Sequence, residues 1–302
     1  MSKRSFLLRR LAGTAVSVWV VFTLAFAYVR ATSGLAGAVS VGGGPASPSD
    51  SLLAQYVDWL VWFATIWDAP VAAPILESLP YTLAYLVPGL AFAVVAGIGV
   101  RIYTVASEGN RLERLTDGFT LLAVSVPTFL LAYFLRWWLL PHYFSLLNDV
   151  RIYDPLLGPL SLRNLQATVW PASVMGLYLF AVQLHYSGEE LREYLSAEFV
   201  KTARAKGAGV WRVGRHVFRN AAIPLLTLFF TDMLGMVVVG VFVVEFVTHV
   251  PGVGELAMDA VLDRNLKLVF SLALLSVLAG VFTNFLQDVA YALFDPRVDF
   301  GE

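Results

Sequence analysis

The sequence predicts an all-α, polytopic membrane protein with six transmembrane helices, on three grounds. Of its 302 residues, 58% are hydrophobic and only 14% are charged, whereas soluble domains are roughly 45–50% apolar. Six stretches provide the roughly 20 mostly apolar residues that a helix needs to cross the hydrocarbon core. Basic residues gather in the segments expected on one side of the bilayer. The six stretches are Leu11 to Val29, Leu79 to Val100, Phe119 to Leu140, Thr168 to Tyr186, Ala221 to Val247 and Leu268 to Ala292.

The first stretch is expected to stay as a membrane anchor. Lys3, Arg4, Arg9 and Arg10 precede it, as they would in a secretory signal, but its apolar core is longer than the about 7–15 residues of a signal. We therefore expect one membrane domain over residues 1–302, with an outer loop at 31–78 and a cytoplasmic loop at 187–220.

The orientation follows from arginine and lysine. If the N-terminus is inside, fifteen of the 21 Lys and Arg residues fall in inner segments. The positive-inside rule then places both termini and the basic loop in the cytoplasm.

The apolar segment Leu52 to Trp67 could be mistaken for a seventh crossing. Asp58 lies at its middle, where a charge costs about 2.5–3.5 kcal/mol, and a crossing here would place the basic loop outside. We expect it to lie flat on the outer surface, with Asp58 in water and Trp59, Trp62 and Trp67 at the interface.

The basic loop reads as two helices separated by a glycine turn. No Gly or Pro occurs from Ser196 to Lys206, and Gly207 and Gly209 follow. A second, amphipathic helix then has one apolar face, at Val210, Val213, Gly214 and Val217, and one basic face, at Arg212, Arg215, His216 and Arg219. Such a helix could simply bind anionic lipid, at about 1 kcal/mol per basic residue. The small side chains of Ala203 and Gly207 favour the close approach of a protein partner instead.

The stretch EFVKTARAKGAGVWRVGRHVFRNAAIPLL, Glu198 to Leu226, resembles the cytoplasmic coupling loop of ABC importer membrane subunits of the type I kind. It is most similar to the dipeptide, oligopeptide and nickel permease family, and to its first, B-type, permease subunit. Lys201 replaces a usual glutamate and Asn220 a usual proline, and both departures recur in the peptide subfamily. Four further strings match that family in order, at Arg9 to Leu11, Leu76 to Val100, Leu115 to Phe134 and Val243 to Val269, and a fifth at the C-terminal Tyr291 to Gly301.

The resemblance implies an ATP-driven importer of peptides in the cytoplasmic membrane of a bacterium or archaeon. Its expected partners are a homologous second permease in a heterodimer, two ATP-binding subunits, an external substrate-binding protein and the lipid bilayer, without nucleic acid. The chain has no G-x-x-x-x-G-K-[ST] loop, so ATP and Mg²⁺ are expected on the partner ATPase subunits and no cofactor in this chain. The residues expected to couple to an ATPase are Glu198, Phe199, Thr202, Ala203, Arg204, Lys206 and Gly207.

Polar residues at bilayer depth mark the expected translocation path. Asp232 and Asn284 are expected to line it, together with Gly235, because ionisable groups in a membrane usually face a bundle interior or a water-filled path. Hydrogen bonds that only hold helices together explain them equally well.

Other classes of function find less support in the sequence. It has no cysteine, and its four histidines lack ligand spacing, so we expect no metal site and no catalysis within the chain. A secondary carrier would need its own ion site at the midplane and usually two related halves. A membrane-anchored enzyme or scaffold using the basic helix is the third class. Within the importer class, nickel chelates or oligosaccharides are the alternative cargo.

Overall fold

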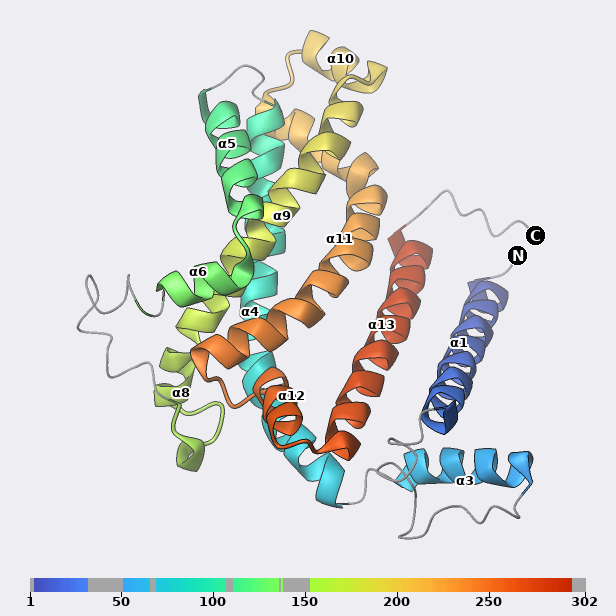
Figure 1. Ribbon diagram of the computed structural model, residues 1–302. Helices are drawn as coiled ribbons and strands as arrows, with labels where there is room; N and C mark the ends of the chain where they lie inside the picture. Colours follow the sequence, from blue (N-terminus) through green and yellow to red (C-terminus); the bar gives the residue numbers. More distant parts are fainter. Residues whose placement is uncertain are drawn as a thin grey trace.

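The protein is helical throughout the part that the computed structural model describes, residues 3–31, 51–65, 69–106, 111–135, 137 and 153–294 (Figure 1). The predicted all-α class is therefore confirmed. The helices are α1 (Lys3–Ala31), α3 (Leu52–Thr65), α4 (Ala69–Ala106), α5 (Arg111–Ser125), α6 (Thr128–Phe134), η4 (Pro155–Leu157), α8 (Leu162–Ala167), α9 (Val169–Leu195), α10 (Glu198–Ala205), α11 (Val210–Thr248), α12 (Val253–Leu262) and α13 (Leu266–Phe294).

The described helices supply up to six membrane spans. Four are continuous, at Leu8–Ala31, Val71–Thr104, Leu162–Gly188 and Lys267–Val289, and two are bent pairs. The six expected crossings agree with this number, although the third and fifth differ in form from what the sequence predicted. The predicted fifth stretch lies within α11, which runs unbroken from the amphipathic segment after Gly209 to Thr248.

The third predicted span is broken at Pro127. The helices α5 and α6 meet at 94°, and Pro127 has the extended backbone, φ −57° and ψ 137°, of a residue that ends one helix and starts another. The second bent pair joins the end of α11 to α12 at 80°. Each bent pair is apolar enough to count as one span, so both are spans with a sharp break rather than straight helices.

Glycines allow α4 and α9 to pack closely along most of their length. A Cβ on Gly89 would lie 3.2 Å from the carbonyl oxygen of Ala172, and one on Gly176 would lie 3.4 Å from the carbonyl oxygen of Gly89. Further along, a Cβ on Gly97 would lie 2.8 Å from the Cγ of Gln183. Close backbone approach of this kind is a main source of helix association in lipid, where apolar side chains gain little from leaving the solvent.

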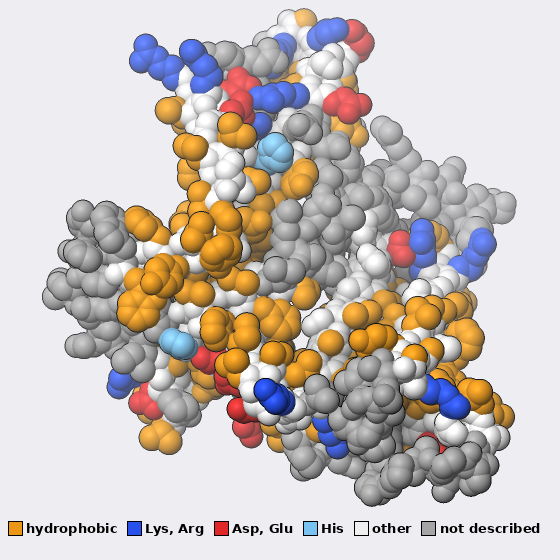
Figure 2. Space-filling model, viewed as in Figure 1, with side chains coloured by type: hydrophobic (Ala, Val, Ile, Leu, Met, Phe, Trp, Pro, Cys, Tyr) orange, Lys and Arg blue, Asp and Glu red, His pale blue; other side chains and the backbone are white. Residues whose placement is uncertain are grey.

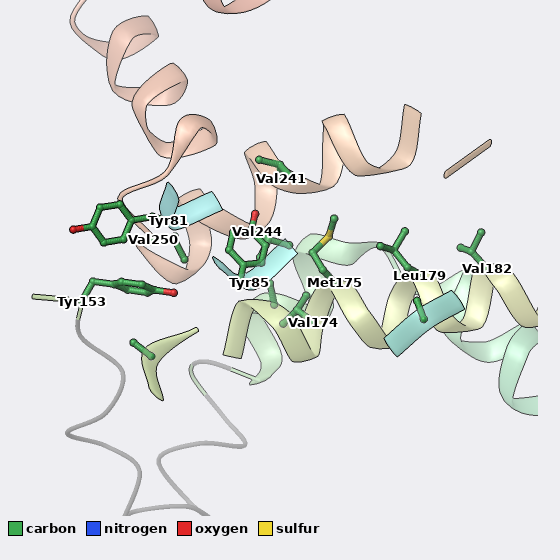
Figure 3. Packing of buried hydrophobic residues seen from close by; sticks show 13 residues of the cluster. Tyr81, Tyr85, Tyr153, Val174, Met175, Leu179, Val182, Val241, Val244 and Val250 are labelled. Atoms are coloured by element: carbon green, nitrogen blue, oxygen red, sulfur yellow. The ribbon is translucent and has the colours of Figure 1, made fainter. Parts of the chain in front are cut away.

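The largest core cluster surrounds this helix pair (Figure 3). Tyr85 of α4, Met175 and Leu179 of α9 and Val244 of α11 are completely buried. Figure 3 shows Met175 between the helices that carry Tyr85 and Val241, with Tyr81 and Tyr153 at one end of the cluster. The rings of Tyr81 and Tyr153 meet edge to face at 6.0 Å. The core therefore joins α4, α9 and α11 into one body.

A buried carboxylate joins α11 to α12 and α4. Glu245 is fully buried, and its Oε1 accepts hydrogen bonds from the hydroxyls of Thr82 at 2.7 Å and Tyr85 at 2.9 Å. Its Oε2 accepts from the backbone N–H of Gly254 at 2.6 Å, in the first turn of α12. The unpaired N–H groups and the dipole of a helix N-terminus favour a negative charge there. Glu245 of α11 therefore caps the N-terminus of α12, and this contact stabilises the bend between the two helices.

The surface helix α3 lies across one end of α1 (Figure 1), and Asp58 is exposed, as predicted. The predicted interfacial position of Trp59 is wrong, because this side chain is only 5% exposed. Its ring packs against Phe26 of α1 at 6.2 Å and Phe270 of α13 at 5.5 Å. Trp59 is thus a structural anchor, while the side chain of Trp62 and all of Trp67 lie outside the described part.

The two ends of the molecule differ in charge. The start of α1, the end of α13 and α10 all point to one end, and α3, α8 and α12 lie at the other (Figure 1). Figure 2 shows a group of basic and acidic side chains at the end that bears α10, and a broad band of hydrophobic side chains below it. We call the end with α10 the cytoplasmic end, following the positive-inside rule.

Gly89→Val should destabilise the protein, because the added methyl groups would press on the backbone of α9. We expect a loss of about 1–3 kcal/mol, the usual cost of overpacking. Gly99→Val, in the same helix, is the matched control, since a Cβ at Gly99 would meet no atom within 4 Å. Thermal unfolding of both variants in detergent measures the difference, and equal melting temperatures would contradict the close contact.

Candidate functional site

The candidate site is the hairpin formed by α10, the turn after it and the start of α11 at the cytoplasmic end. The helix α10 has only eight residues and ends at Ala205. Gly207 follows with φ +79°, in the left-handed region. Its N–H donates to the carbonyl of Arg204 at 2.9 Å, and the N–H of Ala208 donates to that of Ala203 at 3.0 Å. These two bonds are the Schellman motif, which ends the helix sharply and turns the chain into α11.

The need for glycine at position 207 is explained by the backbone conformation there and not by a lack of space for a side chain. A Cβ there would meet nothing within 4 Å, so within this chain no contact requires its small size. The positive φ does require glycine, because L-residues with a Cβ are disfavoured in that region. A Gly207→Asp substitution would therefore disturb the turn itself as well as any partner contact.

A small hydrophobic cluster seats α10 on the rest of the protein. Val200 is 1% exposed and packs in a cluster with Leu191 and Leu195 of α9 and Val213 and Val217 of α11. The predicted amphipathic start of α11 is confirmed at Val213, Gly214 and Val217, which are buried, and at the described basic side chains, Arg212, Arg215 and His216, which are exposed. Val210, also predicted on the apolar face, is 39% exposed because it is the first residue of the helix. The hairpin is therefore a fixed part of the end of the bundle.

The other side chains of α10 point away from this cluster. Phe199, Thr202, Arg204 and Lys206 are exposed, as is Glu198, while Ala203 is half-buried. Phe199 is next to the buried Val200 in sequence, but its own ring is 38% exposed. Trp211, in the first turn of α11, was not predicted as a site residue and is 78% exposed. An apolar ring on a basic, water-facing hairpin is typical of a protein contact.

Five charged and small residues tie the cytoplasmic ends of α4, α5 and α9 together. Arg101 of α4 is 3% exposed, and its guanidinium donates to Asp117 of α5 at 2.6 Å. Arg192 of α9 donates to the same carboxylate at 2.8 Å and to Glu113 at 3.2 Å. The absence of a side chain at Gly188 leaves the space that Arg101 fills, since a Cβ on Gly188 would lie 1.9 Å from the guanidinium.

This ion cluster was not foreseen, because in the sequence Arg101 is only one of the basic residues of an inner segment. The ion cluster adjoins the hydrophobic cluster on which α10 packs. Ile102, the residue after Arg101 in α4, packs against that hydrophobic cluster around Val200. A Cβ on Gly214 of α11 would lie 2.5 Å from Ile102. The hairpin, α4, α5 and α9 are therefore in mechanical contact.

The residues expected on the translocation path are only partly described. Asp232 and Gly235 lie in α11, but their side chains fall outside the described part of the structure. Asn284 lies in α13 and is exposed. Among the described residues, no group of three or more His, Cys, Asp or Glu side chains could hold a metal ion.

The described part of the chain is thus a helical membrane domain with a basic hairpin fixed to its cytoplasmic end. The chain belongs to the family of binding-protein-dependent transport system inner membrane components, whose model matches residues 89–300. It is thus a multi-pass protein of the cytoplasmic membrane.

Named relatives agree with this family. A protein of Brucella suis biovar 1 named as a putative peptide permease is 31% identical over 241 residues, which cover 77% of this chain and 72% of the relative. A probable peptide ABC transporter permease of Sinorhizobium fredii is 26% identical over 97% of this chain and 98% of its own. An oligopeptide transport system permease of Bacillus subtilis is 24% identical over 82% and 81%.

Asp117→Asn should destabilise the cytoplasmic end, because it removes the charge that faces the buried Arg101. Breaking a buried ion pair costs about 3–5 kcal/mol, and we expect about 1–3 kcal/mol here because the Asp117 side chain is 41% exposed. Glu198→Gln is the control, since its pair with Lys201 is exposed at 87% and 63%; it should change stability by less than about 0.5 kcal/mol. Equal unfolding midpoints in detergent for the two variants would show that the cluster does not stabilise this end.

Proposed function

We propose that this chain is one half of the membrane path of an ATP-driven peptide importer. In this proposal it pairs with a homologous permease, two cytoplasmic ATP-binding subunits bind the pair, and a binding protein delivers peptides from outside. The names of the relatives support peptides as the cargo. The observation that carries the proposal is the fixed hairpin with its exposed, basic α10.

The helix α10 is proposed to dock on an ATPase subunit through Phe199, Thr202, Ala203, Arg204 and Lys206. Glu198 lies in its first turn, where an acidic side chain favours the helix dipole, and it pairs with Lys201 at 2.7 Å. Gly207 supports the site by fixing the turn. Lys, Arg and one aromatic ring on a short rigid helix suit a groove with acidic and apolar walls.

Force applied to α10 has two routes into the membrane. One is covalent, because α11 continues for 39 residues from the hairpin through Thr248, about 58 Å at 1.5 Å per residue. The other runs through the cluster around Val200 to α9 and Ile102. The ion cluster then links α9 and α4 to α5. Movement of the ATPases would thereby rotate several helices together, which is what alternation between inward-open and outward-open states requires.

ATP and Mg²⁺ belong, in this proposal, to the ATP-binding subunits, and this chain contributes no cofactor. Its own contribution to the path is proposed to include Asp232, Gly235 and Asn284. The exposure of Asn284 in α13 is consistent with a position facing the second permease or the path.

Ala203→Glu should uncouple ATP hydrolysis from transport. Ala203 is half-buried on α10, so the substitution would place an additional charge at the edge of the contact without changing the turn at Gly207. We expect uptake to fall at least about tenfold, which corresponds to only about 1.4 kcal/mol of lost interaction, while hydrolysis by the complex continues. Both rates are measured in proteoliposomes.

Ala203→Ser is the matched control for this variant, because it is small and uncharged, and it should keep uptake close to that of the wild type. Normal, ATP-dependent uptake by Ala203→Glu would contradict the docking role of α10.

The complete complex should take up peptides only when ATP is present on the side of the basic hairpin. The chain alone, in liposomes, should transport nothing, because its energy comes from the partner subunits. Uptake of a labelled peptide is measured in competition with unlabelled peptides, a nickel chelate and an oligosaccharide. Only peptides should compete. Transport by the isolated chain would instead identify a secondary carrier.

A further inference from the structure

A groove of about 660 Å³ lies in the corner between α1 and α3. This volume falls within the roughly 300–1,000 Å³ of sites that hold small molecules. Trp19 and Ala27 of α1 line one wall, and Leu53 and Tyr56 of α3 line the other. The corner precedes residues 89–300, which the family model matches, so the family assignment alone does not explain it.

The wall of the groove is apolar because its polar side chains are paired with each other. The hydroxyls of Thr23 and Tyr56 are 2.8 Å apart and share a hydrogen bond. Trp19 is 55% exposed and Leu53 is 72% exposed, and Ala27 is also exposed. An apolar surface of this shape suits a hydrocarbon chain.

The orientation of the two helices puts this groove at the outer boundary of the hydrocarbon core. The helix α1 is a candidate membrane span, and α3 lies across its outer end (Figure 1). Contacts of Trp59 with Phe26 and Phe270 hold α3 in place. The corner beneath α3 therefore faces the acyl region of the outer leaflet, where hydrocarbon is the solvent.

A positively charged side chain, that of Arg30, lies at one end of the groove. Arg30, one residue before the end of α1, belongs to the lining and is exposed. Its Nη1 donates to the Oε1 of Gln55 on α3. A guanidinium has five N–H donors, so this bond leaves donors available in the fork geometry that matches a phosphate.

We infer that the corner between α1 and α3 is a binding site for a phospholipid of the outer leaflet, with its phosphate on Arg30 and an acyl chain along Trp19 and Ala27. Such a lipid would fill the angle between the first span and the surface helix. It would thereby complete the packing of α3 on the membrane domain.

The test uses the full-length chain, purified with the subunits that accompany it, with a photoreactive phenylalanine analogue at position 27. After extensive washing in detergent, dioleoyl phosphatidylglycerol is added in mixed micelles at a low mole fraction. Dioleoylglycerol, which has the same chains and no phosphate, is the matched ligand. After irradiation, mass spectrometry of the intact chain gives the yield of each adduct.

We expect the phosphatidylglycerol adduct to exceed the dioleoylglycerol adduct about fivefold, as one basic side chain at a membrane surface would produce. Arg30→Gln should remove this preference. Arg163→Gln should keep it, because Arg163 is an exposed arginine of α8 that does not line the groove. The same probe at Ala15, an exposed residue of α1 that is not part of the lining, should show no preference.

Equal yields at positions 15 and 27 would overturn the inference, because they would indicate only the annular lipid around any span. A main adduct with a second protein chain would also overturn it and would show that a partner subunit covers the corner. The probe at Leu53, on the opposite wall, repeats the test in case the analogue at position 27 fills the groove itself, and it should give the same preference for phosphatidylglycerol.

Discussion

The close contact between α4 and α9 is the constraint on which the rest of the structure depends. In lipid, helices gain little from burying apolar side chains, so backbones that touch supply much of the association energy. Gly89 and Gly176 bring the two backbones together near the core around Tyr85 and Met175. Near the cytoplasmic end, Gly188 provides the space in which Arg101 lies. One seam of small residues thus positions both the hydrophobic core and the ion cluster.

The cytoplasmic end combines rigidity with exposure. Val200 is buried against α9 and α11, and the Schellman turn at Gly207 sets the angle between α10 and α11. At the same time the side chains of Phe199 and Trp211 are exposed. A short helix that is fixed from below and exposed above can pass on a displacement without unfolding, which is the property that a coupling element needs.

Local patterns predicted the helices, whereas contacts distant in sequence could not be foreseen. The run without Gly or Pro before Gly207 predicted α10. The helical spacing of Val213, Gly214 and Val217, with basic residues between them, predicted the start of α11. Arg101 looked like an ordinary inner-loop charge, because nothing near it in sequence indicates that Gly188 will make room for it. Trp59 looked like an interfacial anchor, since its burial depends on Phe270 of the last helix. Hydropathy located the third span, and Pro127 is a residue type that can kink or start a span, but the near-right angle of the break could not be foreseen.

The buried carboxylate of Glu245 also bears on how the chain enters the membrane. During synthesis α11 leaves the ribosome before α12, and a charged Glu245 facing hydrocarbon alone would be expensive. The N–H groups that satisfy its Oε2 belong to the first turn of α12, and the hydroxyls on its other oxygen belong to α4, which is made earlier. Release of α11 and α12 into the bilayer together would spare Glu245 from facing hydrocarbon without these partners.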